Sequence, residues 1–339
     1  MPAPPMPAPP MPAPLLIADV PWLLYRAFFS LPKSIVGADG EPVNALLGTV
    51  NAILAVLEAR PARAVAACMG AEEAVYRVEL YPGYHAQREP MPPELAAQWE
   101  RAPALLESLG WTFATDTELE ADDVMFSFAL AEIAGGRIAG ESTSASRRGN
   151  GDAQSGEDRS AAGGRAAGGH RSARALLLTG DRDLYQAVNE RVAVVLPGKG
   201  GADPEEIGPE QVRERYGIDP ALVTDFIALR GDPSDGLPGA PGIGAKTAAE
   251  LLDRYGPLEE VLRVARADDS DMRLRTALAL SENEELLLNF KRIATLVPID
   301  GIVWPADRAT DFAGGARMAA ELGMKQLARR LERMAGASG

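Results

Sequence analysis

The chain has 339 residues and a net charge of −14, enough length for one large domain or two modest ones. No apolar run approaches the roughly 20 residues that span a bilayer, and the N-terminus lacks the pattern of a signal peptide, so we expect a cytoplasmic protein with no membrane partner. A single cysteine, Cys68, excludes an internal disulfide, and two histidines, His85 and His170, argue against a histidine-rich metal centre. The acidic balance argues against a nucleic-acid coating protein but not against an enzyme that gathers carboxylates around metal ions.

The N-terminal half begins with a proline-rich tail and then alternates strand and helix patterns. Residues 1–14 repeat Met-Pro-Ala-Pro-Pro, which predicts a disordered, extended tail. Short runs that are apolar on both faces are typical of buried parallel strands, and they occupy residues 15–19, 64–69, 111–114, 175–179 and 192–196. Helical periodicity covers residues 43–58, 93–109 and 122–133. The alternation predicts an α/β fold with a mostly parallel central sheet.

The second half of the chain is expected to be mainly helical. Residues 135–173 are rich in Gly, Ser, Ala and Arg and predict a disordered insertion. Helical patterns follow at residues 210–216, 220–230, 245–255, 258–265 and 274–296, with a further amphipathic helix at 316–334. We therefore expect an α/β domain over residues 15–205, a helical lobe over 206–300 and a C-terminal extension over 301–339.

Acidic side chains gather where the predicted strands end and where the helical lobe begins. They are Asp19, Glu120, Asp122, Asp123, Asp181, Asp183, Asp232 and Asp235. Ligands collect at the carboxyl ends of strands in open α/β sheets, so these acids should converge. Carboxylates without His or Cys suit Mg²⁺ or Mn²⁺, and two such ions can drive a displacement at phosphorus. Each acid alone is compatible with a helix cap or a turn, but the whole set favours a metal site.

A glycine-rich turn opens one helix of the lobe. Residues 237–248 place a Pro-Gly turn and Gly-Ile-Gly before a helix, as in a helix-hairpin-helix. Exposed backbone N–H groups at a helix N-terminus bind phosphate without reading base sequence. The expected DNA contacts are Gly239, Gly242, Gly244, Lys246 and Thr247. The alternative is a glycine-rich turn with no ligand.

Several motifs together resemble one family. Asp19, Tyr25-Arg26-Ala27-Phe28-Phe29, the Glu-Ala-Asp-Asp motif at 120–123, Thr-Gly-Asp-Arg-Asp-Leu at 179–184 and Gly-Asp-Pro-Ser-Asp-Gly at 231–236 occur in register with the hairpin. In this the chain is similar to the flap endonuclease/5′-3′ exonuclease family, including the 5′-nuclease domain of bacterial DNA polymerase I and stand-alone actinobacterial 5′-3′ exonucleases. The resemblance covers about residues 15–300, apart from the insertion.

The resemblance implies a PIN-like nuclease domain, a helix-hairpin-helix lobe and a helical arch over about residues 76–100. It implies that Arg77 and Arg88 contact the scissile phosphate and that Tyr25, Arg26 and Tyr84 contact DNA. It further implies cleavage of 5′ flaps, nicks and 5′ ends with two Mg²⁺ ions, which Mn²⁺ can replace. The resemblance also implies a monovalent cation at the hairpin and a DNA polymerase as partner. It further implies a monomeric state, association with the nucleoid, and a role in primer removal or repair.

Three residues depart from the family pattern. Val20 replaces a glycine, His85 replaces the arch lysine, and Met69-Gly70 lacks the acid usual after the second strand. One metal site is complete through Asp123, Asp181, Asp183, Asp232 and Asp235, and the site from Asp19, Glu120 and Asp122 is one ligand short. We expect Gly70→Asp to strengthen that site unless Glu72 or Glu73 already fills it. The alternative function is a catalytically weakened or inactive protein that binds DNA junctions.

Overall fold

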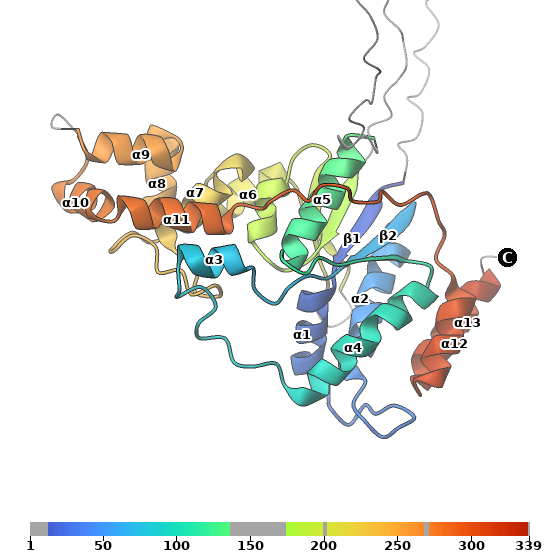
Figure 1. Cartoon of the computed structure of the whole chain (residues 1–339). Coiled ribbons are helices and arrows are strands. Elements are labelled where there is room, and N and C mark those ends of the chain that lie inside the picture. The colour runs from blue at the N-terminus through green and yellow to red at the C-terminus, as the bar shows by residue number, and fades with distance from the viewer. Residues whose placement is uncertain (1–12, 136–173, 199–201, 268–270, 338–339) are drawn as a thin grey trace, which may run out of the picture.

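A computed structural model describes residues 13–135, 174–198, 202–267 and 271–337 (Figure 1). Residues 1–12 of the proline-rich tail and 136–173 of the expected insertion lie outside this range, so both predictions stay open. Within the described residues, no helix is long and apolar enough to cross a membrane.

A six-stranded sheet with the order β3-β2-β1-β4-β5-β6 forms the centre of the first domain. The strands are β1 Leu15–Asp19, β2 Ala64–Cys68, β3 Thr112–Ala114, β4 Ala175–Leu178, β5 Val192–Leu196 and β6 Glu205–Ile207. The first five strands in chain order are parallel, which confirms the predicted sheet. The sixth, β6, was not predicted, and it pairs antiparallel with β5 at the sheet edge.

Helices cover both faces of this sheet, which explains why its central strands are apolar throughout. Leu16 and Ala18 of β1 face the core under α1 Val20–Ser30, α2 Asn44–Ala59 and α4 Pro93–Ser108. Leu15 and Ile17 face the other core, which includes α5 Ala121–Ile133 and continues into the helical lobe. Because successive side chains in a strand point to opposite faces, one five-residue strand contributes to two cores.

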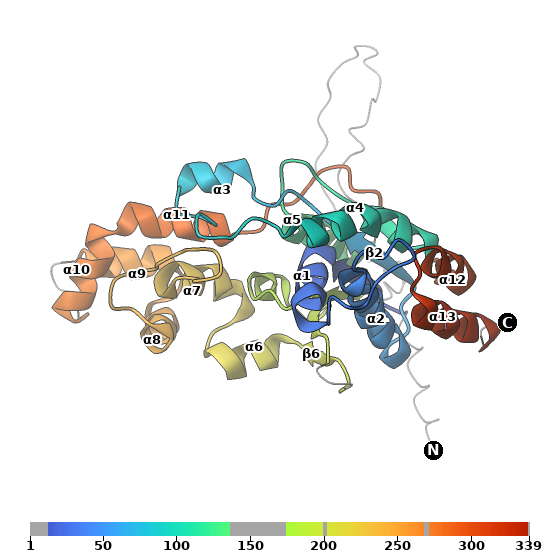
Figure 2. The same cartoon turned by 90° about the horizontal axis from the view of Figure 1, so that it is seen from below.

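The helical lobe lies beside the sheet, and α3 Val75–Leu80 joins the two (Figures 1 and 2). Its elements are α6 Pro209–Tyr216, η2 Pro220–Leu222, α7 Val223–Arg230, α8 Ala245–Tyr255, α9 Leu258–Ala265, α10 Leu274–Glu282 and α11 Glu284–Ala294, whereas the 3₁₀ turn η1 Asp183–Ala187 lies between β4 and β5 of the sheet. Tyr81, directly after α3, packs edge-on against Phe290 of α11 with ring centroids 5.0 Å apart.

Two predicted helices are each divided, so their prediction as single helices was wrong. The pattern at 274–296 forms α10 and α11, because Asn283 leaves helical geometry and its side chain donates to Ala279 O at 2.8 Å. The pattern at 316–334 forms α12 Phe312–Glu321 and α13 Lys325–Ala337. The turn between them contains Gly323 at φ 79°, where an added Cβ would lie 2.3 Å from Ala38 N.

A buried ion pair ties the C-terminal extension to the sheet. The Arg63 guanidinium forms an ion pair with Glu132, donates to Pro305 O at 2.7 Å and stacks on Trp304 at 4.2 Å. Trp304 in turn donates its indole N–H to Glu132 Oε2 at 2.7 Å. The Glu132 side chain is only 1% exposed, so its charge is stabilised by these two donors rather than by water.

We predict that Arg63→Leu lowers the free energy of unfolding by about 3–5 kcal/mol, because it leaves Glu132 buried and unpaired. The matched control is Arg213→Ala, which breaks the exposed pair with Asp219 and should cost less than about 1 kcal/mol. Urea unfolding of both variants measures the difference. Equal losses in the free energy of unfolding would show that the buried Arg63–Glu132 pair stabilises the protein no more than the exposed Arg213–Asp219 pair does.

Candidate active site

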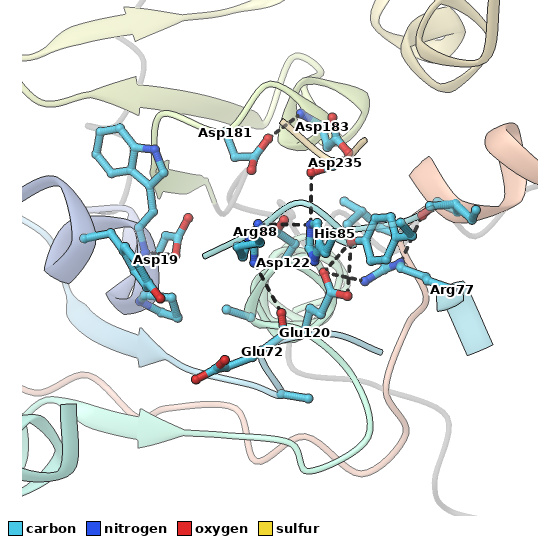
Figure 3. Close-up of a pocket in the computed structure, with 18 of the residues that line it drawn as sticks. Asp19, Glu72, Arg77, His85, Arg88, Glu120, Asp122, Asp181, Asp183 and Asp235 are labelled. Carbon is cyan, nitrogen blue, oxygen red and sulfur yellow. Dashed lines mark hydrogen bonds and ion pairs between the residues drawn. The ribbon is translucent and has the colours of Figure 1, made fainter. Parts of the chain in front are cut away.

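A cavity of about 350 Å³ opens at the carboxyl end of the sheet (Figure 3). It brings together acids from three strand ends, from the start of α5 and from the helical lobe. Its acidic lining residues are Asp19, Glu72, Glu120, Asp122, Asp181, Asp183 and Asp235. Its basic and aromatic lining residues are Arg77, His85, Arg88, Trp22, Tyr25, Tyr84 and Trp99.

Asp19 is fixed by its position as the last residue of β1 and the N-cap of α1. Its Oδ1 accepts from Trp22 N at 3.0 Å, and its Oδ2 accepts from the Thr179 hydroxyl at 2.6 Å. The side chain is buried, and this burial raises the pKa of Asp19 to about 6 in spite of both hydrogen bonds. The site therefore holds a carboxylate that is costly to charge without a cation.

Asp181 and Asp183 follow β4 in a tight turn. Asp181 N donates to Thr179 Oγ1 at 3.0 Å, and Asp183 N donates to Asp181 Oδ1 at 3.2 Å. Burial first, and then neighbouring carboxylates, raise the pKa of Asp181 to about 7 and the pKa of Asp183 well above its usual range. Oδ1 of Asp183 is buried and has no hydrogen-bond partner among the described residues. A buried acceptor of this kind is expected where a ligand is missing.

The Glu-Ala-Asp-Asp motif divides between two roles at the start of α5. Asp122 lines the cavity, and burial together with the charges of Asp181 and Asp19 raises its pKa well above the usual range. Asp123 does not line it: Asp123 pairs with Arg77 at 2.9 Å and accepts from Val297 N at 2.8 Å. The structure therefore places Asp123 in a structural contact with the second lobe, outside the cavity lining, where it shares Arg77 with Glu120.

Glu120 is held by three donors. Ala74 N lies 2.7 Å from its Oε1, the Tyr84 hydroxyl 2.9 Å from its Oε2, and Arg77 Nη1 3.0 Å from its Oε2. Arg77 is almost fully buried and also donates to Ile293 O of α11 at 3.0 Å. Arg77 thus joins α3, α5 and α11, and its predicted contact with a phosphate would require it to exchange these partners.

Asp232 and Asp235, which are close in sequence, face different surroundings. Asp232 Oδ1 accepts from Ser234 N at 2.9 Å, and the residue lines a separate small cavity with Arg182 and Arg230. Asp235 lines the main cavity, where its Oδ1 lies 3.2 Å from His85 Nε2. Asp235 therefore lines the main cavity, whereas Asp232 lies outside its lining but near enough for its charge to raise the pKa values of Asp181 and Asp183.

Two basic residues enter the cavity from the segment between α3 and α4. His85 adopts a positive φ of 52°, stacks on Tyr84 at 3.9 Å and donates its backbone N–H to Asp235 O at 3.0 Å. Arg88 Nη2 lies 3.0 Å from His85 Nε2. This segment, part of the expected arch, is thereby docked onto the helical lobe (Figure 3).

Gly70 leaves no room for the acid that the family has at this position. A Cβ at residue 70 would lie 2.5 Å from Ala121 N and 2.6 Å from Leu119 O, both backbone atoms. The expectation that Gly70→Asp would restore a metal ligand is therefore wrong on steric grounds. Glu72 lines the cavity whereas Glu73 does not, so Glu72 is the one of the two that can supply a substitute carboxylate.

The cavity's donor set fits divalent cations held through oxygen. Four carboxyl groups with raised pKa values lie together: Asp19 and Asp183 are buried, Asp122 and Asp181 are half-buried, and the charge of Arg77 offsets the rise only in part, at Asp183. No three metal-ligating side chains within the described residues already surround one point. The carboxylate oxygens of the cavity are the kind of ligand that Mg²⁺ prefers, and Mg²⁺ is usually held by one or two carboxylates together with several waters.

The predicted hairpin connects α7 to α8. Gly239 at φ 68° packs so closely that an added Cβ would lie 2.3 Å from Gly231 N, and Gly242 also has a positive φ of 77°. Gly244 is the N-cap of α8 and has open space around it. Thr247 is half-buried, and the Lys246 side chain is 89% exposed. The hairpin can therefore receive a phosphate without rearrangement.

The sequence analysis did not predict several residues of the cavity, and two residues that it predicted to contact DNA, Tyr25 and Arg26, lie in different surroundings. Trp22 and Trp99 were not predicted, although Trp22 lies three residues after Asp19 and hence on the first turn of α1. Thr179, which lies outside the cavity lining and donates its hydroxyl to Asp19, was also not predicted. The half-buried side chain of Tyr25 lines the cavity. The Arg26 side chain instead donates to Gly198 O at 3.2 Å and lies over the Trp22 ring. DNA contact by either residue stays a prediction.

We predict that Gly70→Asp and Gly70→Ala both destabilise the protein, by about 1–3 kcal/mol, because the first side-chain carbon already overlaps backbone. Thermal unfolding with and without Mg²⁺ measures the effect. If the aspartate variant matched the parent and gained more stability from Mg²⁺ than the alanine variant, residue 70 would border the metal site after all.

Comparison with known proteins agrees with this arrangement. Residues 14–138 match the model of the 5′-3′ exonuclease N-terminal resolvase-like domain, and residues 218–300 match that of the 5′-3′ exonuclease C-terminal SAM fold. A 5′-3′ exonuclease of Mycobacterium tuberculosis is 31% identical over 94% of this chain and 96% of its own length. One from Streptomyces coelicolor is 33% identical over 76% of this chain and 77% of its own length.

More distant relatives share part of the chain or only the fold. DNA polymerase I of Mycobacterium bovis is 32% identical over 73% of this chain, which spans 24% of the polymerase. The T5 D15 flap endonuclease, solved with DNA and metal ions, superposes with a TM-score of 0.59 at 16% identity, covering 95% of this chain and 99% of its own. The catalytic core of Rad2 superposes with a TM-score of 0.54 at 12% identity, covering 95% and 93%. On its sequence and its fold, the chain belongs to the 5′-3′ exonuclease family.

Proposed function

We propose that this protein is a divalent-metal-dependent nuclease that hydrolyses DNA phosphodiesters near 5′ ends, on flaps, nicks and free ends. The observation that carries the proposal is the meeting of Asp19, Asp122, Asp181, Asp183 and Asp235, from both lobes, in one cavity. The relatives named 5′-3′ exonuclease along nearly the whole chain support the same reaction class.

Mg²⁺ or Mn²⁺ would be held by Asp19, Asp122, Asp181 and Asp183. Three further acids line the same cavity, namely Glu72, Glu120 and Asp235. Bound ions would polarise the phosphate and lower the pKa of a coordinated water. In the reaction, the water oxygen forms a bond to phosphorus, the bond to the leaving oxygen breaks, and that oxygen takes up a proton.

The remaining groups of the cavity orient the substrate. Arg88 lines the cavity, and within the described residues its guanidinium contacts the Glu72 carbonyl oxygen at 3.4 Å and His85 Nε2 at 3.0 Å but no carboxylate, so it can bind a phosphate oxygen. Arg77 holds Glu120 in place and keeps α3 against α11, and we propose that it acts as a positioning residue. Tyr84, His85 and Arg88 of the segment 81–92 line the cavity, so a 5′ strand that reaches the acids would pass this segment.

The hairpin would hold duplex away from the cavity. Backbone N–H groups at the start of α8 and the exposed Lys246 suit a phosphate backbone without base readout. A monovalent cation at this hairpin, a polymerase partner, and a role in primer removal or repair stay predictions of the sequence. The alternative, an inactive junction-binding protein, is motivated by Gly70, and it predicts binding without cleavage.

We predict that Asp181→Asn lowers the cleavage rate of a 5′-labelled flap by about 100-fold or more in Mg²⁺. It should also raise the melting temperature without metal, because it removes one charge from a repelling buried set. The matched variant Asp123→Asn should lower the melting temperature and leave cleavage by folded protein near that of the parent. Cleavage by Asp181→Asn at the parent rate would remove this residue from the site, and no cleavage by the parent in Mg²⁺ or Mn²⁺ would favour the junction-binding alternative.

Lys246→Ala should weaken binding of nicked or flapped duplexes by a similar factor for every sequence and reduce the salt dependence by roughly one phosphate contact. Lys325→Ala, an exposed lysine on the C-terminal extension, is the matched control. Titration at several salt concentrations compares them. If the two variants behaved alike, the hairpin would not be the duplex contact.

A further inference from the structure

Two tryptophans line the acid-rich cavity without a role in the proposed chemistry. Trp22 comes from α1, directly after the Asp19 cap, and Trp99 comes from α4. Both side chains are half-buried. Both rings pack partly against the core, and the part that faces the cavity does not bind metal ions and is open to another ligand.

The indole nitrogens separate the tryptophans into two kinds. Trp111 donates to Thr310 Oγ1 at 3.0 Å, and Trp304 donates to Glu132 Oε2 at 2.7 Å. Within the described residues, the indole N–H groups of Trp22 and Trp99 have no acceptor in the protein. Tryptophan usually finds a partner for this group when it serves the core. The two cavity tryptophans thus keep a free donor, and the two structural ones do not.

Packing then separates Trp99 from Trp22. Trp22 is wedged against Gly180, where an added Cβ would lie 2.0 Å from the indole, and the Arg26 guanidinium lies 5.7 Å from its ring centroid. Among the aromatic rings of the described residues, Trp99 meets Tyr25, edge-on at 6.4 Å and 81°. Trp99 packs partly against the core, on the same face of α4 as Leu95 one turn earlier, and it also lines the cavity. Of the two rings, Trp99 is the one without a close glycine or guanidinium neighbour among the described contacts, so a planar partner is better placed on it than on Trp22.

We propose that Trp99 stacks on an unpaired nucleobase of the strand whose phosphate lies at the acids, and so forms a sequence-tolerant base subsite. The inference rests on the proposed nuclease function. Every nucleobase has a π-face, so such a contact selects for an unpaired base without reading its identity. The Arg88 guanidinium in the same cavity supplies a phosphate contact for that nucleotide. Trp99 would then favour substrates with an intact base over those with an abasic site at this position.

The test uses the full chain and a duplex with a single-stranded 5′ arm that carries 2-aminopurine at one arm position at a time. Binding is measured with Ca²⁺, and the DNA is checked to be intact afterwards. One position should be quenched by the parent and by Trp99→Phe, but not by Trp99→Ala. Trp99→Leu keeps apolar volume without the π-face and separates stacking from packing. Melting temperatures of all three variants show whether they are folded.

We expect Trp99→Ala and Trp99→Leu to bind the arm about 5- to 100-fold more weakly, and Trp99→Phe to stay close to the parent. An abasic residue at the quenched position should abolish the difference between parent and Trp99→Ala. The proposal is overturned if Trp99→Leu binds as the parent does, or if the abasic arm preserves the difference. Should the parent fail to cleave a flap while these binding results hold, the nuclease function fails and the base subsite remains. Should it cleave normally with all Trp99 variants equal, only the base subsite fails.

Discussion

The structure depends on the burial of several like charges at one edge of the sheet. Asp19, Asp122, Asp181 and Asp183 all have pKa values raised first by burial, to about 6 for Asp19 and about 7 for Asp181. A raised carboxyl pKa means that the stability these groups contribute is fully present below their unfolded pKa near 3.8 and is lost as the pH rises through about 6 and 7. At neutral pH the ionised acids therefore lower the free energy of unfolding, and a bound divalent cation would offset this loss.

The surrounding structure distributes this cost over both lobes. Arg77 is the one buried cation that the described contacts place against the acids at the start of α5, and it reaches α11 as well. The segment that carries His85 and Arg88 closes onto Asp235 of the helical lobe. The two lobes are thereby joined through the site itself, so a ligand that neutralises the acids should also change how firmly this segment is held.

The sequence predicted the parallel sheet and most of the acids because both follow from short-range rules. Strands that are buried on both faces are continuous apolar runs, and acids that follow such strands reach one sheet edge. These rules do not predict the positions of the Asp123 and Asp232 side chains. Each residue is one turn or less from a cavity acid in the sequence, yet Asp123 pairs with Arg77 and Asp232 accepts from Ser234 N. Gly70 shows the same limit, since the packing of the backbone of residues 119–121 against it rules out a side chain. Trp99 lies far in the sequence from the acids that line the cavity and belongs to none of the recognised motifs, so it was not predicted.

The central claim is that these buried carboxylates hold protons when free and give them up to divalent cations. Calorimetric titration with Mn²⁺ in buffers of different ionisation enthalpy measures the protons released for each ion bound. The account predicts that more protons are released for each ion bound at about pH 6, where Asp19 and Asp181 are partly protonated, than at about pH 8.5, where these two are ionised. Binding without proton release at the lower pH, or no binding at either pH, would contradict it.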